Sequence, residues 1–160
     1  MIRKVKLSDA EEIAAIYNKY ILTTTISFEV AALSVEEMRQ RISALAADFP
    51  YYVYEEEGHV MGYCYAHKWK ERAAYNKTLE TTIYLSSNYT QHGIGTELMK
   101  TLISDCKEMG VRALIACITY ENEASIRFHE RLGFEKVSHF KQVGMKFGRV
   151  LDVVDYQLIL

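Results

Sequence analysis

The chain has 160 residues, a length that suits one domain spanning residues 1–160. Hydrophobic residues make up 49% of the sequence and can build a core, which excludes an intrinsically disordered chain. With 19 Lys and Arg against 21 Asp and Glu, the net charge of −2 argues against a protein that binds nucleic acid, since such proteins usually carry a basic excess.

Neither a membrane nor a metal ion is expected as a partner. The charged N-terminus lacks the apolar segment of a secretory signal, and no apolar run reaches the roughly 20 residues that cross a bilayer. The five histidines show no metal-ligand spacing. The three cysteines lack CxxC spacing, which indicates reduced, mostly buried thiols and a cytoplasmic protein. They are Cys64, Cys106 and Cys117.

The first half of the chain predicts two helices and several strands. Alternating apolar and charged residues from Ile2 to Leu7 predict a short strand. Two capping boxes, Ser8 with Glu11 and Ser34 with Glu37, predict where the two helices begin, with a loop between them. The strands expected next are Tyr51–Tyr54, Val60–Trp69 and Thr78–Leu85.

The second half predicts helices that alternate with strands. Gly95–Met109 has the pattern of an amphipathic helix that stops at Gly110. Val111–Thr119 is nearly all apolar, as in a strand covered on both faces, and Asn122 is a good N-cap for the next helix. The terminal strands expected are Phe134–Val143 and Val150–Leu160. This order predicts a mixed α/β sheet with helices on both faces.

The most informative segment is the polar loop between the Thr78–Leu85 strand and the next helix. Gly93 and Gly95 open that helix, and glycine allows a ligand to approach the backbone closely. The first N–H groups of a helix have no partner within it, and the helix dipole favours an anion such as a pyrophosphate. The glycine pair alone also fits an ordinary tight turn.

Over essentially its whole length the chain resembles the GNAT superfamily of acetyl-CoA-dependent N-acetyltransferases. Gly93 and Gly95 match the family's pyrophosphate loop, and the segment from Asn122 to Phe134 matches its second signature. Thr90 stands where the family loop usually begins with Gln or Arg. The resemblance implies an α/β (α+β) fold with a mixed, mostly antiparallel central sheet, and acetyl-CoA as co-substrate.

The resemblance also implies which residues hold the coenzyme. The backbone of Ile83, Tyr84 and Leu85 would bind the pantetheine arm like an added strand, and the Leu85 N–H would donate to the thioester oxygen. Asn122 would reach the pantetheine arm. His129, or a water that it holds, would donate a proton to the departing thiolate. The amides expected around the diphosphate are those of Gln91, His92, Gly93, Ile94, Gly95 and Thr96.

Three segments resemble the phosphinothricin and methionine sulfone/sulfoximine N-acetyltransferases. Ile16–Asn18 precedes Ser27–Glu29, Lys70–Lys77 precedes Glu80–Tyr84, and Gly144–Asp152 looks like the closing turn and strand. Val150 in that last segment stands where a tryptophan is common. This branch implies transfer to the α-amino group of a small amino-acid-like substrate, and a homodimer.

Glu80 is the candidate general base. An ammonium group must lose a proton before its nitrogen can attack, and a carboxylate beside the thioester can accept that proton. Alternation along a strand puts Glu80, Thr82 and Tyr84 on one face, with Thr82 at the substrate. Taken alone, Glu80 also fits a solvated charge on a strand.

Two segments are expected to bind the substrate. The guanidinium of Arg72 suits a phosphinate, sulfone or carboxylate, and the neighbouring residues would form a substrate loop. Phe28 and Glu29 would close the opposite wall, with Glu29 near the substrate ammonium. The members of the loop are Arg72, Ala73, Ala74 and Tyr75.

Two other functions remain open on the sequence. The acceptor could be another amine, such as a different amino acid, a polyamine or a protein N-terminus. The chain could also be an acetyl-CoA-binding sensor without transferase activity, which would need the glycine loop but no base. The presence of Glu80 argues against a sensor.

Overall fold

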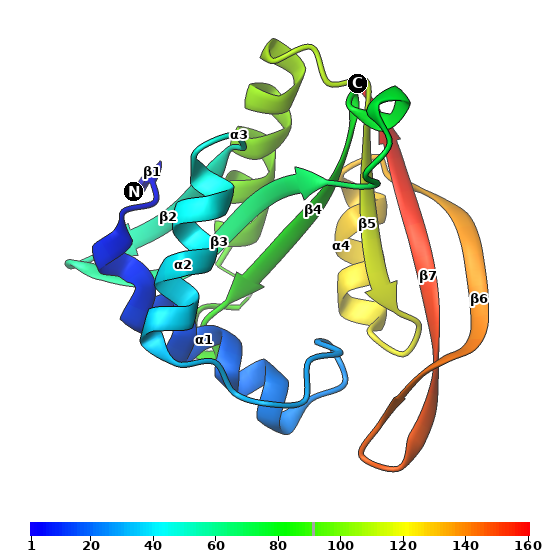
Figure 1. The fold of residues 1–160 in the computed structure, drawn as a ribbon, viewed down its shortest axis with the longest axis horizontal. Helices are drawn as coiled ribbons and strands as arrows, with labels where there is room; N and C mark the ends of the chain where they lie inside the picture. The colour runs from blue at the N-terminus through cyan, green and yellow to red at the C-terminus, as the bar shows by residue number, and fades with distance from the viewer. Residues whose placement is uncertain (91) are drawn as a thin grey trace.

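The computed structural model describes residues 1–90 and 92–160, and within them seven strands form one sheet in the order β1-β2-β3-β4-β5-β7-β6 (Figure 1). Neighbouring strands are antiparallel except β4 and β5, which are parallel. The strands are β1 Ile2–Lys4, β2 Tyr51–Glu56, β3 His59–Lys68, β4 Thr78–Leu85, β5 Ala113–Thr119, β6 Glu135–Lys146 and β7 Arg149–Ile159. The predicted mixed, mostly antiparallel sheet is confirmed.

Helices cover both faces of this sheet, as expected. They are α1 Ala10–Thr23, α2 Val35–Ala46, α3 Ile94–Glu108 and α4 Glu123–Arg131, with short 3-10 turns η1 Leu7–Asp9, η2 Ala73–Tyr75 and η3 Ser87–Tyr89. Ile13 of α1 and Ile42 of α2 pack on Val53 of the sheet, whereas Leu98 and Leu102 of α3 belong to a second core on the other face. We call the two sides the α1–α2 face and the α3–α4 face. Within the described ranges, no helix is long and apolar enough to span a bilayer.

β4 and β5 separate soon after they begin, and this positions the candidate site. Their pairing runs only from Thr78 opposite Ala113 to Glu80 opposite Ile115. The hydroxyl of Thr81 then donates to the Ile115 carbonyl oxygen (3.4 Å), where the backbone ladder ends. Figure 1 shows β4 and β5 diverging toward the lower part of the view. Because β4 stays paired to β3 and β5 to β7, the gap opens without breaking the sheet apart.

Several local sequence signals proved accurate. β4 covers the predicted residues Thr78–Leu85. The capping box at the start of α2 is present, since Ser34 Oγ accepts from the Glu37 N–H (3.1 Å) and Glu37 accepts from the Ser34 N–H (2.7 Å). Asn122 Oδ1 accepts from the Ser125 N–H (3.2 Å), which confirms the N-cap of α4. Both caps depend on residues within one turn of chain.

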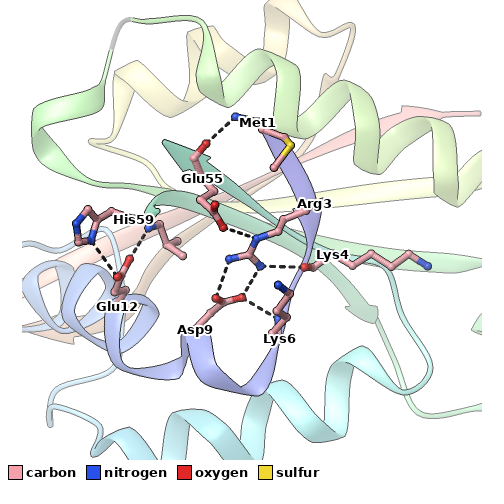
Figure 2. Close-up of polar contacts among 9 residues, drawn as sticks. Met1, Arg3, Lys4, Lys6, Asp9, Glu12, Glu55 and His59 are labelled. Carbon is pink, nitrogen blue, oxygen red and sulfur yellow. Dashed lines mark hydrogen bonds and ion pairs between the residues drawn. The ribbon is translucent and has the colours of Figure 1, made fainter. Parts of the chain in front are cut away.

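The predicted capping box of Ser8 with Glu11 is wrong, because α1 begins at Ala10 after a 3-10 turn. The Asp9 carboxylate instead accepts two hydrogen bonds from the Arg3 guanidinium (2.8 and 2.9 Å) and one from the Lys6 N–H (2.7 Å) (Figure 2). The start of α1 therefore depends on an arginine of β1, which the local pattern does not include.

Asp9→Ala is expected to lower the free energy of unfolding by about 1–3 kcal/mol, since it leaves a half-buried guanidinium with fewer acceptors. Burial alone would raise the pKa of Asp9, but the hydrogen bonds from Arg3 and Lys6 hold it below its ordinary value. The stabilisation by the ionised Asp9 carboxylate is therefore complete at neutral pH and is lost as the pH falls through that lowered pKa. Urea denaturation at pH 7 and at pH 3 measures the difference.

The matched control for Asp9 is Glu36→Ala, which removes the exposed pair with Arg39. Its effect is expected to stay below about 0.5 kcal/mol because water screens an exposed ion pair. Equal losses in the two variants at pH 7 would contradict the role assigned to Asp9.

Two of the three cysteines are buried as predicted, and the third is exposed. Cys64 and Cys106 lie in the core on the α3–α4 face. Cys117 lies on β5, where the strand has already parted from β4, and so the opposite side chains do not cover it. The expectation that this strand is covered on both faces is wrong at this one position.

Candidate active site

A cavity of about 680 Å3 occupies the gap between β4 and β5. Its walls include residues 80–85 of β4 and 116–119 of β5, so side chains from both faces of the sheet line it. Glu80, Thr82 and Tyr84 contribute from the α1–α2 face, as the predicted alternation requires. Phe128 and His129 of α4 line it on the α3–α4 face. The cavity therefore passes from one face of the sheet to the other.

The N-terminus of α3 fits a diphosphate at the α3–α4 end of this cavity. Gly93 is the N-cap and has φ +78°, in the left-handed region that glycine favours. The Glu97 N–H is the first to bond back, to the Gly93 carbonyl (3.1 Å), which leaves the N–H groups of Ile94, Gly95 and Thr96 without a partner inside the helix. Unpaired amides and the helix dipole together favour an anion there.

Close packing keeps this helix start near β4. A Cβ on Gly95 would lie 3.4 Å from both a Leu85 methyl and the Phe128 ring, in van der Waals contact, so a side chain longer than that of alanine would press on the cavity wall. Thr96 is half-buried, and His92 is exposed beside the loop. Gln91, also predicted to contact the diphosphate, lies outside the described residues.

The open edge of β4 offers backbone groups to an extended ligand. The Ser86 N–H donates to the Met61 carbonyl (2.8 Å), and backbone groups alternate in direction along an antiparallel ladder. The N–H groups of Ile83 and Leu85 therefore point away from β3, toward the gap. Tyr84 faces β3 with its backbone, so it contributes its ring to the cavity and not the main-chain contact predicted for it.

His129 lines the cavity as a neutral imidazole. Its side chain is buried, and Nδ1 lies 2.8 Å from the Ser125 carbonyl oxygen, to which it can only donate. Burial lowers the pKa of His129, although the bond to Ser125 opposes this. The remaining nitrogen, Nε2, then carries a lone pair and no proton. Burial disfavours the protonated ring that direct donation requires, so donation through a water held by His129 fits better, and the predicted role stays a prediction.

Glu80 sits where the two strands begin to part, among groups that adjust its basicity. Burial raises the pKa of Glu80, and the negative charge of Asp155 raises it further. His67 opposes this rise, and its Nε2 lies 3.8 Å from Oε1 of Glu80. Cys117 lies opposite Asp155. Although part of its side chain reaches solvent, the surrounding protein withdraws the thiol from bulk water, and this, with the charges of Asp155 and Glu80, raises its pKa to about 12 and keeps it neutral. A carboxylate with a raised pKa is a stronger base, which suits proton removal from an amine.

The pH dependence of turnover is expected to report Glu80. The acidic limb of kcat/KM should lie above the ordinary range of a glutamate, because only the ionised carboxylate can accept a proton. His67→Gln removes the neighbour that lowers this pKa and should move the limb to higher pH. Steady-state rates from pH 5 to 9 measure it, and a limb that moves to lower pH in the variant would contradict the assignment.

The loop between α1 and α2 closes the cavity on the α1–α2 face. Phe28 and Glu29 both line it, as predicted. The Glu29 carboxylate, however, accepts two hydrogen bonds from the Arg41 guanidinium (2.9 and 2.6 Å) and one from the Tyr17 hydroxyl. It is therefore already paired, but a carboxylate accepts about four hydrogen bonds, so the predicted contact with a substrate ammonium stays a prediction.

The predicted substrate loop lies outside the cavity lining of the single chain. Arg72, Ala73, Ala74 and Tyr75 lie in or beside η2, which precedes β4 at the end of the strand nearer Glu80. Tyr75 packs edge-on against Trp69. Among the described residues that line the cavity, the carboxylates are Glu29 and Glu80, and none is Lys or Arg. The role of the loop in substrate binding therefore stays a prediction.

Two tyrosines of α1 belong to the site, although the sequence predicts no site role for either. Tyr17 and Tyr20 both line the cavity, and each ring lies 5.0 Å from the Tyr84 ring. The Tyr20 hydroxyl donates to the Leu85 carbonyl (2.6 Å) and so holds the end of β4. The available signal was the hydroxyl itself, since a buried tyrosine needs a polar partner.

Comparison with known proteins agrees with this geometry. The acetyltransferase (GNAT) domain family matches residues 2–154. A phosphinothricin N-acetyltransferase from Alcaligenes faecalis is 39% identical over 155 residues, which cover 96% of this chain and 79% of that protein. An L-methionine sulfoximine/L-methionine sulfone acetyltransferase from Salmonella typhimurium is 32% identical over 165 residues, covering 99% and 94% of the two chains.

Among solved structures, a GNAT superfamily phosphinothricin acetyltransferase from Sinorhizobium meliloti in complex with AcCoA superposes with a TM-score of 0.96. It is 35% identical, and the match covers 100% of this chain and 88% of that one. The unpaired amides of α3 and the open edge of β4 fit the same coenzyme here. The chain therefore belongs to the GNAT family of acetyltransferases and uses acetyl-CoA as its acyl donor.

Proposed function

We propose that the chain transfers the acetyl group of acetyl-CoA directly to the α-amino group of a small amino-acid-like substrate of the phosphinothricin, methionine sulfone or methionine sulfoximine type. The observation that carries this proposal is the single cavity that joins the amides of α3 to Glu80 through the gap between β4 and β5. The relatives named above support the substrate class.

In the proposed mechanism acetyl-CoA supplies an acetyl group activated as a thioester. Glu80 takes the proton from the substrate ammonium, directly or through one water, which frees the nitrogen lone pair for attack. The Leu85 N–H donates to the acetyl oxygen, where negative charge develops. As the C–S bond breaks, the attacking nitrogen would lose its second proton to a water that donates a hydrogen bond to His129 Nε2, and that water would give a proton to the departing sulfur. The neutral Cys117 thiol takes no part as a nucleophile.

We further propose that the substrate loop binds the anionic end of the substrate at the mouth of the cavity. Arg72 supplies a planar fork of donors that suits phosphinate, sulfone and carboxylate oxygens. Its position at the Glu80 end of β4 supports this role. The small side chains of Ala73 and Ala74 leave room beside it.

The β6–β7 hairpin supports the proposal of a homodimer. Met145 is 72% exposed, and Val143, Phe147 and Val150 are each more than half exposed. β6 is the last strand of the sheet, so its outer edge is unpaired among the residues that the structure describes. A second copy of this chain would cover that apolar edge. Analytical ultracentrifugation is expected to give twice the mass of one chain, and a monomer at micromolar concentration would contradict it.

The function is tested by measuring CoA thiol release with a panel of amines. We expect turnover with phosphinothricin, methionine sulfone or methionine sulfoximine, and less with polyamines and with peptides that have a free N-terminus. Preference for a polyamine or peptide would replace the proposed substrate class. Acetyl-CoA binding without turnover on any amine would indicate a sensor, and no binding of acetyl-CoA by calorimetry would remove the function altogether.

A further inference from the structure

A buried lysine outside the cavity holds one of the cavity walls. Residues 26–29 of the loop between α1 and α2 all line the cavity, and we call them the acceptor wall. Lys146, the last residue of β6, is 4% exposed, and its ammonium donates to the Ser27 carbonyl oxygen (2.6 Å). Ser27 is itself buried, and its hydroxyl lies 2.9 Å from the Tyr17 hydroxyl. Lys146 is thus linked to a side chain of the cavity through two hydrogen bonds.

Withdrawing the Lys146 ammonium from water costs free energy, which hydrogen bonds must offset. Burial lowers the pKa of Lys146, and the Glu29 carboxylate, which opposes this, is already paired with Arg41. The Ser27 carbonyl accepts from this ammonium, and the centre of the Phe147 ring lies 5.2 Å from Nζ. Its neighbours Met145 and Phe147 are exposed, so Lys146 turns inward from an otherwise outward-facing turn.

The same strand supports the wall at a second point. A Cβ on Gly144 would overlap the Phe28 ring, so the absence of a side chain at Gly144 lets Phe28 lie directly on β6. The two ends of the acceptor wall are held by other elements. Just before it, the Thr25 carbonyl accepts from the Thr119 hydroxyl (2.8 Å), and at its last residue Glu29 pairs with Arg41. β6 therefore fixes the middle of the acceptor wall, between ties to β5 and α2.

We propose that Lys146 is a positioning residue that sets the acceptor wall and thereby the affinity for the amine substrate, without affecting acetyl-CoA. This inference rests on the proposed function and adds a specificity residue to it. The diphosphate amides of α3 and the open edge of β4 lie on other elements, so the coenzyme site does not depend on Lys146.

The test compares Lys146→Met with Lys141→Met, an exposed lysine on the same strand. Loss of a charge-assisted hydrogen bond is expected to raise KM for the amine about 10-fold in Lys146→Met, with KM for acetyl-CoA changed less than about 2-fold. Lys141→Met should leave both constants unchanged. Lys146→Gln keeps an uncharged N–H donor, carries the same expectation with a smaller increase, and replaces Lys146→Met if that variant does not fold.

Each outcome distinguishes the inference from the function on which it rests. An unchanged amine KM in a folded Lys146 variant, or equal increases for both substrates, would overturn the positioning role and leave the proposed function intact. A wild-type chain that acetylates none of the amines would remove the proposed function, and this inference with it.

Discussion

Glu80→Gln is expected to lower kcat by about 100-fold or more, because the amide cannot accept the proton that the substrate ammonium must lose. The substitution keeps the size of the side chain and the pairing of Glu80 with His67 across β3 and β4. It also removes the ionisable group to which the acidic limb of the pH profile is assigned, so that limb should disappear. Steady-state measurement of CoA thiol release between pH 5 and 9 gives both results.

The control for Glu80 is Glu71→Gln, a carboxylate whose side chain is 94% exposed in the connection between β3 and β4. It should turn over normally. Both variants should bind acetyl-CoA like the wild type in calorimetry, because the diphosphate amides lie on the other face of the sheet. Normal turnover by Glu80→Gln would mean that another group, or solvent, removes the proton.

Gly95→Asp is expected to weaken acetyl-CoA binding by about 100-fold, since it places a negative charge where the diphosphate would bind, and like charges in contact cost several kcal/mol. The new side chain would also press on Leu85 and Phe128. An acidic residue in the first turn favours the helix itself, so α3 should remain formed. The loss of affinity would then come from the changed coenzyme site and not from unfolding of the helix. Isothermal titration calorimetry measures this affinity.

Gly58→Asp is the matched control for Gly95→Asp. Gly58 lies in the turn between β2 and β3, with nothing within 4 Å of a Cβ built there. Its positive φ of +83° is one that aspartate tolerates better than most residues. Acetyl-CoA should bind this variant as it binds the wild type. Unchanged binding to Gly95→Asp would show that the coenzyme does not use the start of α3.

Local patterns in the sequence predicted the elements well, because the interactions that set them lie within a few residues. The limits of β4 and the caps of α2 and α4 are of this kind. The start of α1 could not be predicted in this way, since it depends on a contact between Asp9 and Arg3 of another element. The resemblance, and not periodicity, supplied the expectation that Glu80 and the glycine loop work together.

The site was predicted less completely because its geometry depends on contacts between distant segments. The sequence does not indicate that Glu29 is paired with Arg41 of the next helix. His129 looked like an acid, but the Ser125 carbonyl fixes its tautomer. No periodic feature of Leu79 to Thr82 indicates that β4 leaves β5 after Glu80. The inward turn of Lys146 is equally invisible in an alternating strand.

The parting of β4 from β5 also bears on kinetic order. The coenzyme would enter from the helix that binds its diphosphate, while the amine would enter beneath the tyrosines of α1. Neither molecule would have to pass the other, so both could be bound at the same time and initial-rate plots should intersect. For the same reason either product could leave first. A covalent conjugate of the amine with CoA would occupy both binding sites at once through the gap between the strands. It should therefore inhibit competitively against both reactants.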